Sequence, residues 1–275
     1  MLVKYHFIAG LPRAGSTLLA GILRQNPRFH AAMSSPVLGL TTGALEYMGA
    51  SGEFYTSFDA TKRKQICIGL FDSYYSDMTD KEVIFDTNRM WAARLHLLMD
   101  MFPDSKLICC VRNPAWVMDS FESIYRKNPF DYSQLYTPQT RQTVYSRCEA
   151  MASSAGVLGS AWSALKEAYY SDFSDRLLLI DYDLLAQKPQ QCIQLLYQFI
   201  DEPLYQHDFD NVEYSDGEFD LNLGVKGLHD VKRVVSFKPR RTILPPELFQ
   251  QYSEMAFWQD SSGTNASIIK PQKAT

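Results

Sequence analysis

Four short runs of apolar residues occur along the chain, and longer stretches with a helical pattern separate them. The runs cover residues 5–9, 83–85, 107–111 and 177–180. A strand with one exposed face would carry a polar residue at every second position, and these runs do not show that alternation. They are typical of strands that are buried on both faces of a parallel sheet.

The stretches between the runs repeat apolar residues every three or four positions, which predicts helices with one buried face. The predicted helices cover residues 17–25, 61–78, 90–101, 114–126, 139–170 and 189–200. The alternation predicts an α/β fold, a P-loop-like parallel sheet flanked by helices on both faces. Because no repeat or Pro/Gly-rich linker divides the chain, we expect a single domain over residues 1–275, with a loosely ordered tail after about residue 260.

Sheets of this kind bind ligands beyond the carboxyl ends of their strands. The loops that follow the four predicted strands carry Gly10, Asp86, Arg112 and Asp181. We expect these loops to converge on one site.

The composition adds constraints on the class of protein. With 46% hydrophobic and 21% charged residues, the chain of 275 residues is ordinary for a globular protein. No apolar stretch reaches the roughly 18 residues of a membrane span. The five cysteines are an odd number without the spacing of a metal site, which predicts reduced core residues and a cytoplasmic protein.

The net charge of −4 predicts no general attraction to nucleic acids or anionic membranes. The charges are unevenly distributed, however. Residues 189–225 contain eight acidic and no basic side chains, whereas residues 226–241 contain six basic side chains and one aspartate. We expect an anionic ligand to meet the second segment.

The strongest local signal is the sequence Gly10-Leu11-Pro12-Arg13-Ala14-Gly15-Ser16-Thr17. It follows a predicted strand and opens a predicted helix, where backbone N–H groups and the helix dipole bind phosphate. The two glycines have the spacing of a nucleotide P-loop, but Ser16 stands where the P-loop lysine belongs. Arg13 offers instead a planar fork for two anionic oxygens. An ordinary strand-to-helix turn is the alternative interpretation.

This loop resembles the 5′-phosphosulfate loop of sulfotransferases that use 3′-phosphoadenosine 5′-phosphosulfate (PAPS). Two further segments agree with the resemblance: Arg112 at the end of a strand with Ser120 eight residues later, and the strand-ending sequence Asp181-Tyr182-Asp183. The likeness is closest to tyrosylprotein sulfotransferases, particularly bacterial ones. It implies a sulfotransferase fold and in-line transfer of the sulfuryl group to a tyrosine of a protein or peptide. A hydroxyl of a small molecule or a glycan is the alternative acceptor, and a homodimer is left open.

The resemblance also implies roles for individual residues. Arg13 and the loop around it would bind the 5′-phosphate, while Arg112 and Ser120 would bind the 3′-phosphate. No metal is required. The residues expected to contact PAPS are Pro12, Arg13, Ala14, Gly15, Ser16, Thr17, Arg112, Ser120, Tyr182, Lys226, Lys232 and Arg233.

The general base is where this sequence departs from its relatives. The animal tyrosylprotein enzymes carry an acidic base after the first helix, where residues 32–36 here contain no carboxylate, and a catalytic lysine after the second strand. The matching residues of that strand suggest Asp86 as the base and Arg89 as the replacement cation. Asp86 has an equally good alternative role as a helix cap, and Glu46 and His30 are weaker candidates for the base.

Two other functions are consistent with parts of the sequence. Residues 82–86 resemble the apolar strand of a P-loop kinase or nucleotide hydrolase, whose final aspartate binds magnesium, but the missing loop lysine opposes this interpretation. A non-catalytic nucleotide-binding module is the second alternative. Finally, Tyr214 lies among acidic residues, as sulfated tyrosines do, which raises the hypothesis of self-sulfation; an exposed acidic loop is the simpler interpretation.

Overall fold

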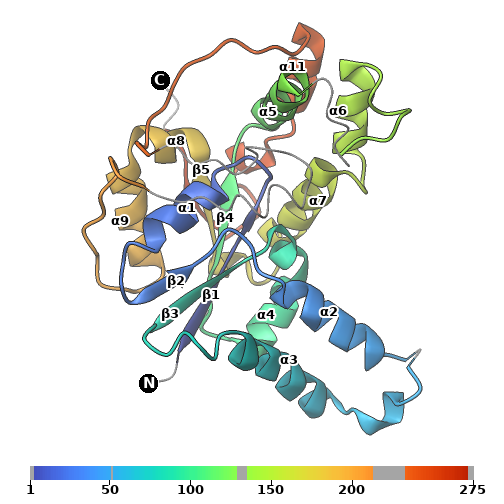
Figure 1. Cartoon of the computed structure of the whole chain (residues 1–275), viewed down its shortest axis with the longest axis vertical. Helices are drawn as coiled ribbons and strands as arrows, with labels where there is room; N and C mark the ends of the chain where they lie inside the picture. Colours follow the sequence, from blue (N-terminus) through green and yellow to red (C-terminus); the bar gives the residue numbers. More distant parts are fainter. Residues whose placement is uncertain (1–2, 51, 129–134, 213–232, 272–275) are drawn as a thin grey trace.

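A six-stranded parallel sheet forms the centre of the protein (Figure 1). The computed structural model describes residues 3–50, 52–128, 135–212 and 233–271. Within these residues the strand order is β2-β3-β1-β4-β5-β6, and all neighbouring strands are parallel. The strands are β1 (Lys4–Gly10), β2 (Phe29–Ala31), β3 (Val83–Thr87), β4 (Leu107–Val111), β5 (Leu177–Asp181) and β6 (Ser267–Ile269).

The four predicted strands are confirmed as β1, β3, β4 and β5. Every residue of β3, β4 and β5 is buried, which is why their sequences read as continuous apolar runs. The edge strands β2 and β6 have three residues each, too few for a pattern to predict them. Residues after about 260, which we expected to be loosely ordered, include β6, and β6 pairs with β5.

Helices cover both faces of the sheet, as the sequence predicts (Figure 1). Figure 1 shows α1 and α9 on one face and α4 and α7 on the other. At one end of the molecule α5 packs against α6 and α11, and at the opposite end α2 and α3 project as a pair. The helices are α1 (Ser16–Leu23), α2 (Val37–Tyr47), α3 (Ala60–Tyr74), α4 (Leu95–Met101), α5 (Pro114–Lys127), α6 (Val144–Ala152), α7 (Val157–Tyr169), α8 (Tyr182–Gln187), α9 (Pro189–Phe199) and α11 (Pro246–Ser253), with a 3₁₀ helix η2 (Arg89–Arg94) before α4. None of the helices in the described ranges combines the length and the apolar character that a membrane span needs.

The single helix predicted over residues 139–170 is wrong, because the chain forms α6 and α7 with a turn between them. Thr143 begins α6 with a capping box: its hydroxyl accepts the N–H of Ser146, and the Ser146 hydroxyl accepts the N–H of Thr143. The turn passes Gly156, where an added Cβ would lie 2.2 Å from the carbonyl oxygen of Ala150. The two helices therefore approach each other too closely for any residue with a side chain at this position.

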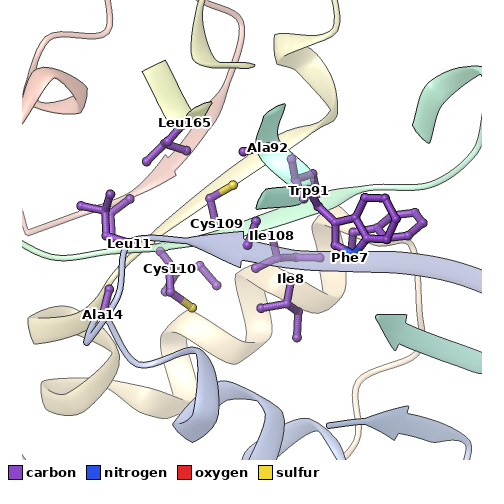
Figure 2. Close-up of a cluster of buried hydrophobic side chains, with 14 of the residues drawn as sticks. Phe7, Ile8, Leu11, Ala14, Trp91, Ala92, Ile108, Cys109, Cys110 and Leu165 are labelled. Atoms are coloured by element: carbon purple, nitrogen blue, oxygen red, sulfur yellow. The ribbon is translucent and has the colours of Figure 1, made fainter. Parts of the chain in front are cut away.

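The hydrophobic core fixes the loop that follows β1 (Figure 2). Phe7 and Ile8 of β1 pack among residues of β4, η2 and α7, and Leu11 and Ala14 of the loop belong to the same buried cluster. All five cysteines are free and buried, which confirms them as core residues. The loop is thus held by apolar side chains on its inner side, and its polar side chains are left for other contacts.

Gly10 is the point where this loop lies closest to the neighbouring strand. Its φ angle is +115°, and an added Cβ would lie 2.1 Å from the carbonyl oxygen of Cys110 on β4. The same oxygen accepts the N–H of Leu11 at 2.9 Å. Only glycine combines this backbone conformation with this contact.

We expect Gly10→Ala to lower the free energy of unfolding by about 2 kcal/mol or more, because it adds both backbone strain and a steric clash. Urea unfolding measures the change. Gly43→Ala is the matched control, because nothing lies within 4 Å of its added Cβ on α2; it should raise the stability by up to about 1 kcal/mol. If Gly10→Ala unfolded at the urea concentration of the native sequence, the close approach would not be a rigid constraint.

Candidate functional site

The carboxyl ends of β1, β3 and β4 open into a cleft of about 620 Å³. Its walls are the loop after β1, residues 87–89, the side chains of Arg112, Ser120 and Tyr182, and residues 234–238 with Arg240. The predicted convergence of the strand-end loops is therefore correct: the loop at Gly10, residues 87–89, Arg112 and Tyr182 line one cleft. Asp86 and Asp181 themselves do not line it. Asp181 instead caps α8, where its carboxylate accepts the N–H groups of Asp183 and Leu184; its burial raises its pKa to about 6.

The loop after β1 enters α1 through two residues with left-handed backbone conformations. Arg13 has a φ angle of +58° and Gly15 one of +94°. A Cβ at Gly15 would lie 2.6 Å from the ring of Tyr182, so this glycine is required for the contact. No side chain caps α1 at Gly15, and Ser16 and Thr17 of its first turn line the cleft. Unsatisfied backbone N–H groups at a helix start bind anions.

A hydrogen bond connects Arg13 of this loop to α5. Nε of Arg13 donates this hydrogen bond of 3.2 Å to Oγ of Ser120, and both side chains line the cleft. The loop and α5 are 107 residues apart in sequence. The hydrogen bond therefore brings together two of the elements that the sequence assigned to the same ligand.

Arg112 follows the last residue of β4 and lacks a full set of partners. Its guanidinium carbon lies 4.4 Å from the ring centre of Tyr182, and its Nε is 3.7 Å from Oδ1 of Asp183. This distance is too long for a hydrogen bond, and within the described part of the chain neither of these two buried atoms has one. Burial lowers the pKa of Arg112 and raises the pKa of Asp183. An anion that accepts from Arg112 would satisfy this donor.

Arg89 reaches the cleft from the end of β3. The N–H of Asn88 donates to the carbonyl oxygen of Ile8 on β1, and the Asn88 side chain caps η2 by accepting the N–H of Met90. Arg89 is open to solvent within the cleft, although the surrounding protein desolvates it and lowers its pKa. Arginines therefore follow three adjacent strands: Arg89 after β3, Arg13 after β1 and Arg112 after β4.

Asp86, the predicted base, does not line the cleft. It is fully buried, and its carboxylate accepts hydrogen bonds from Ser35 at 2.6 Å, Tyr75 at 2.7 Å and Trp91 at 2.6 Å. Burial raises its pKa, and the three donors act in the opposite direction. The cap of the next helix is Asn88, so the alternative role of Asp86 as a helix cap is wrong.

The other two candidates for the base also lie outside the cleft. Glu46 is exposed on α2, and His30 lies on β2 with its ring centre 5.5 Å from that of Tyr75. Among the described residues that line the cleft, none is a carboxylate or a histidine. Likewise, no cluster of potential metal ligands occurs in the described ranges.

Of the three basic residues that we expected to contact the donor in segment 226–241, the structure describes only Arg233. Arg233 does not line the cleft; its Nε donates to the side chain of Asn211 at 2.7 Å. Lys226 and Lys232, like Tyr214, lie outside the described residues. Lys238 and Arg240 line the cleft instead. The sequence placed both in a basic segment, but only the folded chain distinguishes them from their neighbours.

The side chains that line the cleft include a cationic set and an apolar set. Among the described residues the cations are Arg13, Arg89, Arg112, Lys238 and Arg240, and the apolar lining includes Phe121, Leu135, Val157, Val235 and Phe237. An anion fits the first set, and an aromatic or aliphatic group fits the second. The site is therefore suited to a ligand with separated anionic groups and to an apolar second molecule.

Comparisons with known proteins agree with this geometry. The model of the sulfotransferase family matches residues 6–207. A search of curated proteins gives no significant match. Among solved structures, the sulfotransferase domain of the curacin biosynthetic pathway is 18% identical with a TM-score of 0.59, over 92% of this chain and 97% of that domain.

Two further solved structures are similar. The sulfotransferase domain of the Synechococcus olefin synthase is 16% identical with a TM-score of 0.50, over 92% of this chain and 94% of that domain. A sulfotransferase from Mycobacterium avium is 13% identical with a TM-score of 0.52, over 97% of this chain and 79% of that protein. At these identities the likeness concerns the fold.

We expect Asp86→Asn to lower the free energy of unfolding by about 1–3 kcal/mol, because an amide cannot accept all three hydrogen bonds. Urea unfolding, followed by tryptophan fluorescence, measures the loss. Glu46→Gln removes a carboxylate from the exposed surface of α2 and should leave the stability unchanged. Equal stabilities of the two variants would show that Asp86 does not support the fold through these contacts.

Proposed function

Because the chain belongs to the sulfotransferase family, we propose that it transfers the sulfuryl group of PAPS to a hydroxyl acceptor. One observation carries the proposal. Arg13 and Arg112 follow neighbouring strands of the sheet, and Ser120, which binds Arg13, lines the same cleft. The site thus offers two arginine positions to a donor that has two anionic ends.

The resemblance of the sequence to PAPS-dependent sulfotransferases assigns the two ends of the donor to these positions. The 5′-phosphosulfate would contact the N–H groups at the start of α1 together with Arg13, and the 3′-phosphate would contact Arg112 and Ser120. Tyr182 would lie near the nucleotide, because its ring already contacts Arg112 and lies next to Gly15. Cationic groups at two separate positions suit this donor better than a nucleoside triphosphate, whose charges form one linear chain. Ser16 in place of the P-loop lysine supports the same choice.

The reaction is an in-line displacement at sulfur. The bond between sulfur and the bridging oxygen of the 5′-phosphate breaks as the acceptor oxygen forms its bond to sulfur, and the pair of electrons leaves with the nucleotide. Negative charge therefore grows on the 5′-phosphate and on the sulfuryl oxygens, as in phosphoryl transfer. Arg13 would stabilise the first charge, and Arg89, beside the same loop, the second.

The acceptor hydroxyl must also lose a proton. Since Asp86, Glu46 and His30 do not line the cleft, we assign no base among them. Several cations lie in the cleft instead, and their field favours the ionised form of a phenol, whose pKa is otherwise near 10. The proton would then leave to solvent water.

A tyrosine of a protein or peptide is our first choice of acceptor. The resemblance of the sequence to bacterial tyrosylprotein sulfotransferases supports it, and the apolar wall around Phe121 and Phe237 suits an aromatic ring. A small-molecule hydroxyl is the second choice. It is favoured by two of the similar structures, which come from the curacin biosynthetic pathway and from an olefin synthase.

We expect the protein to sulfate a tyrosine in an acidic peptide and also p-nitrophenol, and Arg13→Ala to slow the transfer at least about 100-fold by removing a charge-stabilising donor. Mass spectrometry of the acceptor after incubation with PAPS measures the transfer. Lys127→Ala removes a cation from the exposed end of α5, outside the cleft, and should keep the full rate.

The outcomes separate the alternatives. Transfer to an aliphatic alcohol but to neither phenol would favour the small-molecule function. Tight binding of the desulfated donor, adenosine 3′,5′-bisphosphate, without transfer to any acceptor would favour a non-catalytic nucleotide-binding module. An unchanged rate in Arg13→Ala would overturn the role of the loop.

We expect Arg112→Ala to weaken the binding of adenosine 3′,5′-bisphosphate about 10- to 100-fold, because it removes charged hydrogen bonds to the 3′-phosphate. Adenosine 5′-monophosphate, which lacks that phosphate, should lose much less affinity. Titration calorimetry with both nucleotides measures the difference. If both lost the same affinity, Arg112 would not be the contact of the 3′-phosphate.

A further inference from the structure

A buried carboxylate ties the C-terminal segment 240–244 to α5. Asp119 is fully buried, and its Oδ2 accepts the hydroxyl of Thr242 at 2.9 Å and the N–H of Ile243 at 2.7 Å. Its Oδ1 forms an ion pair with Nη1 of Arg240. The hydroxyl of Thr242 accepts in turn the N–H of Leu244 at 3.1 Å. The segment has neither helix nor strand, so side-chain contacts hold it against α5: those of Asp119, and a hydrogen bond of 3.3 Å from Arg126 to the carbonyl oxygen of Ile243.

These contacts between Asp119 and segment 240–244 lie directly beside the proposed donor site. Asp119 precedes Ser120, which lines the cleft and binds Arg13, and Arg240 lines the same cleft. Two consecutive residues of α5 therefore have different roles at the site. Ser120 is the one proposed to contact the ligand, and Asp119 holds the chain segment that carries Arg240.

Arg240 is fixed by two different contacts. Besides its ion pair with Asp119, its guanidinium carbon lies 5.0 Å from the ring centre of Trp116, one turn earlier on α5. The charges of this cluster also affect Arg112. Burial and the charge of Arg240 lower the pKa of Arg112, whereas the charges of Asp183 and Asp119 raise it. Arg240 and Arg112 line the same cleft, and an anion that contacts both would offset the repulsion between their charges.

A guanidinium that forms an ion pair with a carboxylate still has N–H groups to donate to another anion. We propose that Asp119 is a positioning residue for the donor: it holds Arg240 where the remaining N–H groups meet the same 3′-phosphate as Arg112. This inference rests on the proposed function. Asp119 does not contact the nucleotide itself; it fixes the orientation of Arg240 before the nucleotide arrives, which removes part of the cost of ordering that side chain on binding.

The test compares adenosine 3′,5′-bisphosphate with adenosine 5′-monophosphate by titration calorimetry. Asp119→Asn should weaken the bisphosphate about tenfold and change the monophosphate less than about twofold, since only the 3′-phosphate meets Arg240. Arg240→Gln should give the same selective loss. In the double variant the loss should stay near that of Arg240→Gln alone, because the two residues act through one contact.

Arg241→Ala is the matched control, because Arg241 is the exposed neighbour in the same segment and does not line the cleft. It should leave both affinities unchanged. Arg240 is exposed, so Arg240→Gln should fold even if Asp119→Asn does not. An unchanged preference for the bisphosphate in Arg240→Gln overturns the proposal whatever the stability of the Asp119 variant.

Two outcomes distinguish this inference from the proposed function. If the native protein binds neither nucleotide, the proposed function fails and the role of Asp119 falls with it. If the native protein prefers the bisphosphate, and Asp119→Asn folds and keeps that preference, only the positioning role is wrong. Additive losses in the double variant would likewise show that Asp119 does not act through Arg240.

Discussion

The contact between Gly10 and Cys110 is the constraint on which the rest of the site depends. At this point the backbones of β1 and β4 are so close that no side chain fits, and the carbonyl oxygen of Cys110 accepts the N–H of Leu11. The loop that carries Arg13 leaves from one side of the contact, and the strand that ends before Arg112 leaves from the other. The separation of the two proposed anion-binding positions is therefore set by main-chain atoms.

Carboxylates and guanidinium groups have divided roles around this contact. Asp86 and Asp119 are fully buried and serve as anchors, the first between β3 and the side chains of three other segments, the second between α5 and the C-terminal segment. By contrast, the cationic side chains of Arg13, Arg89, Arg112, Lys238 and Arg240 line the cleft. Keeping negative charge in the interior, where hydrogen bonds compensate it, leaves the field in the cleft positive for an anionic donor.

Much of the fold could be predicted because its signals are local. The four central strands are buried on both faces, so their sequences alone identify them, and the loop after β1 is a continuous motif. The edge strands are too short to leave a pattern, and the break at Gly156 depends on how closely two helices approach.

The same distinction between local sequence signals and contacts formed on folding applies to the candidate site. Arg13, Arg112 and Ser120 belong to motifs and were assigned from sequence, and the structure brings all three to one cleft. Arg240 could not be chosen from its basic neighbours, because its partner Asp119 is 121 positions away in the chain and nothing in either segment points to the other. Asp86 was chosen as a base because it ends a predicted strand near the site, but its carboxylate accepts hydrogen bonds from Ser35, Tyr75 and Trp91, which surround it only after folding.

The ring of Tyr182 fixes the distance between the loop after β1 and the end of β4. It fills the space that a side chain at Gly15 would need, and it also lies beneath the guanidinium of Arg112. A flat aromatic ring cannot be compressed, so it acts as a spacer of fixed thickness between the loop and the strand end. If the proposed donor binds here, this spacer makes the distance between its two charged ends a criterion of selection.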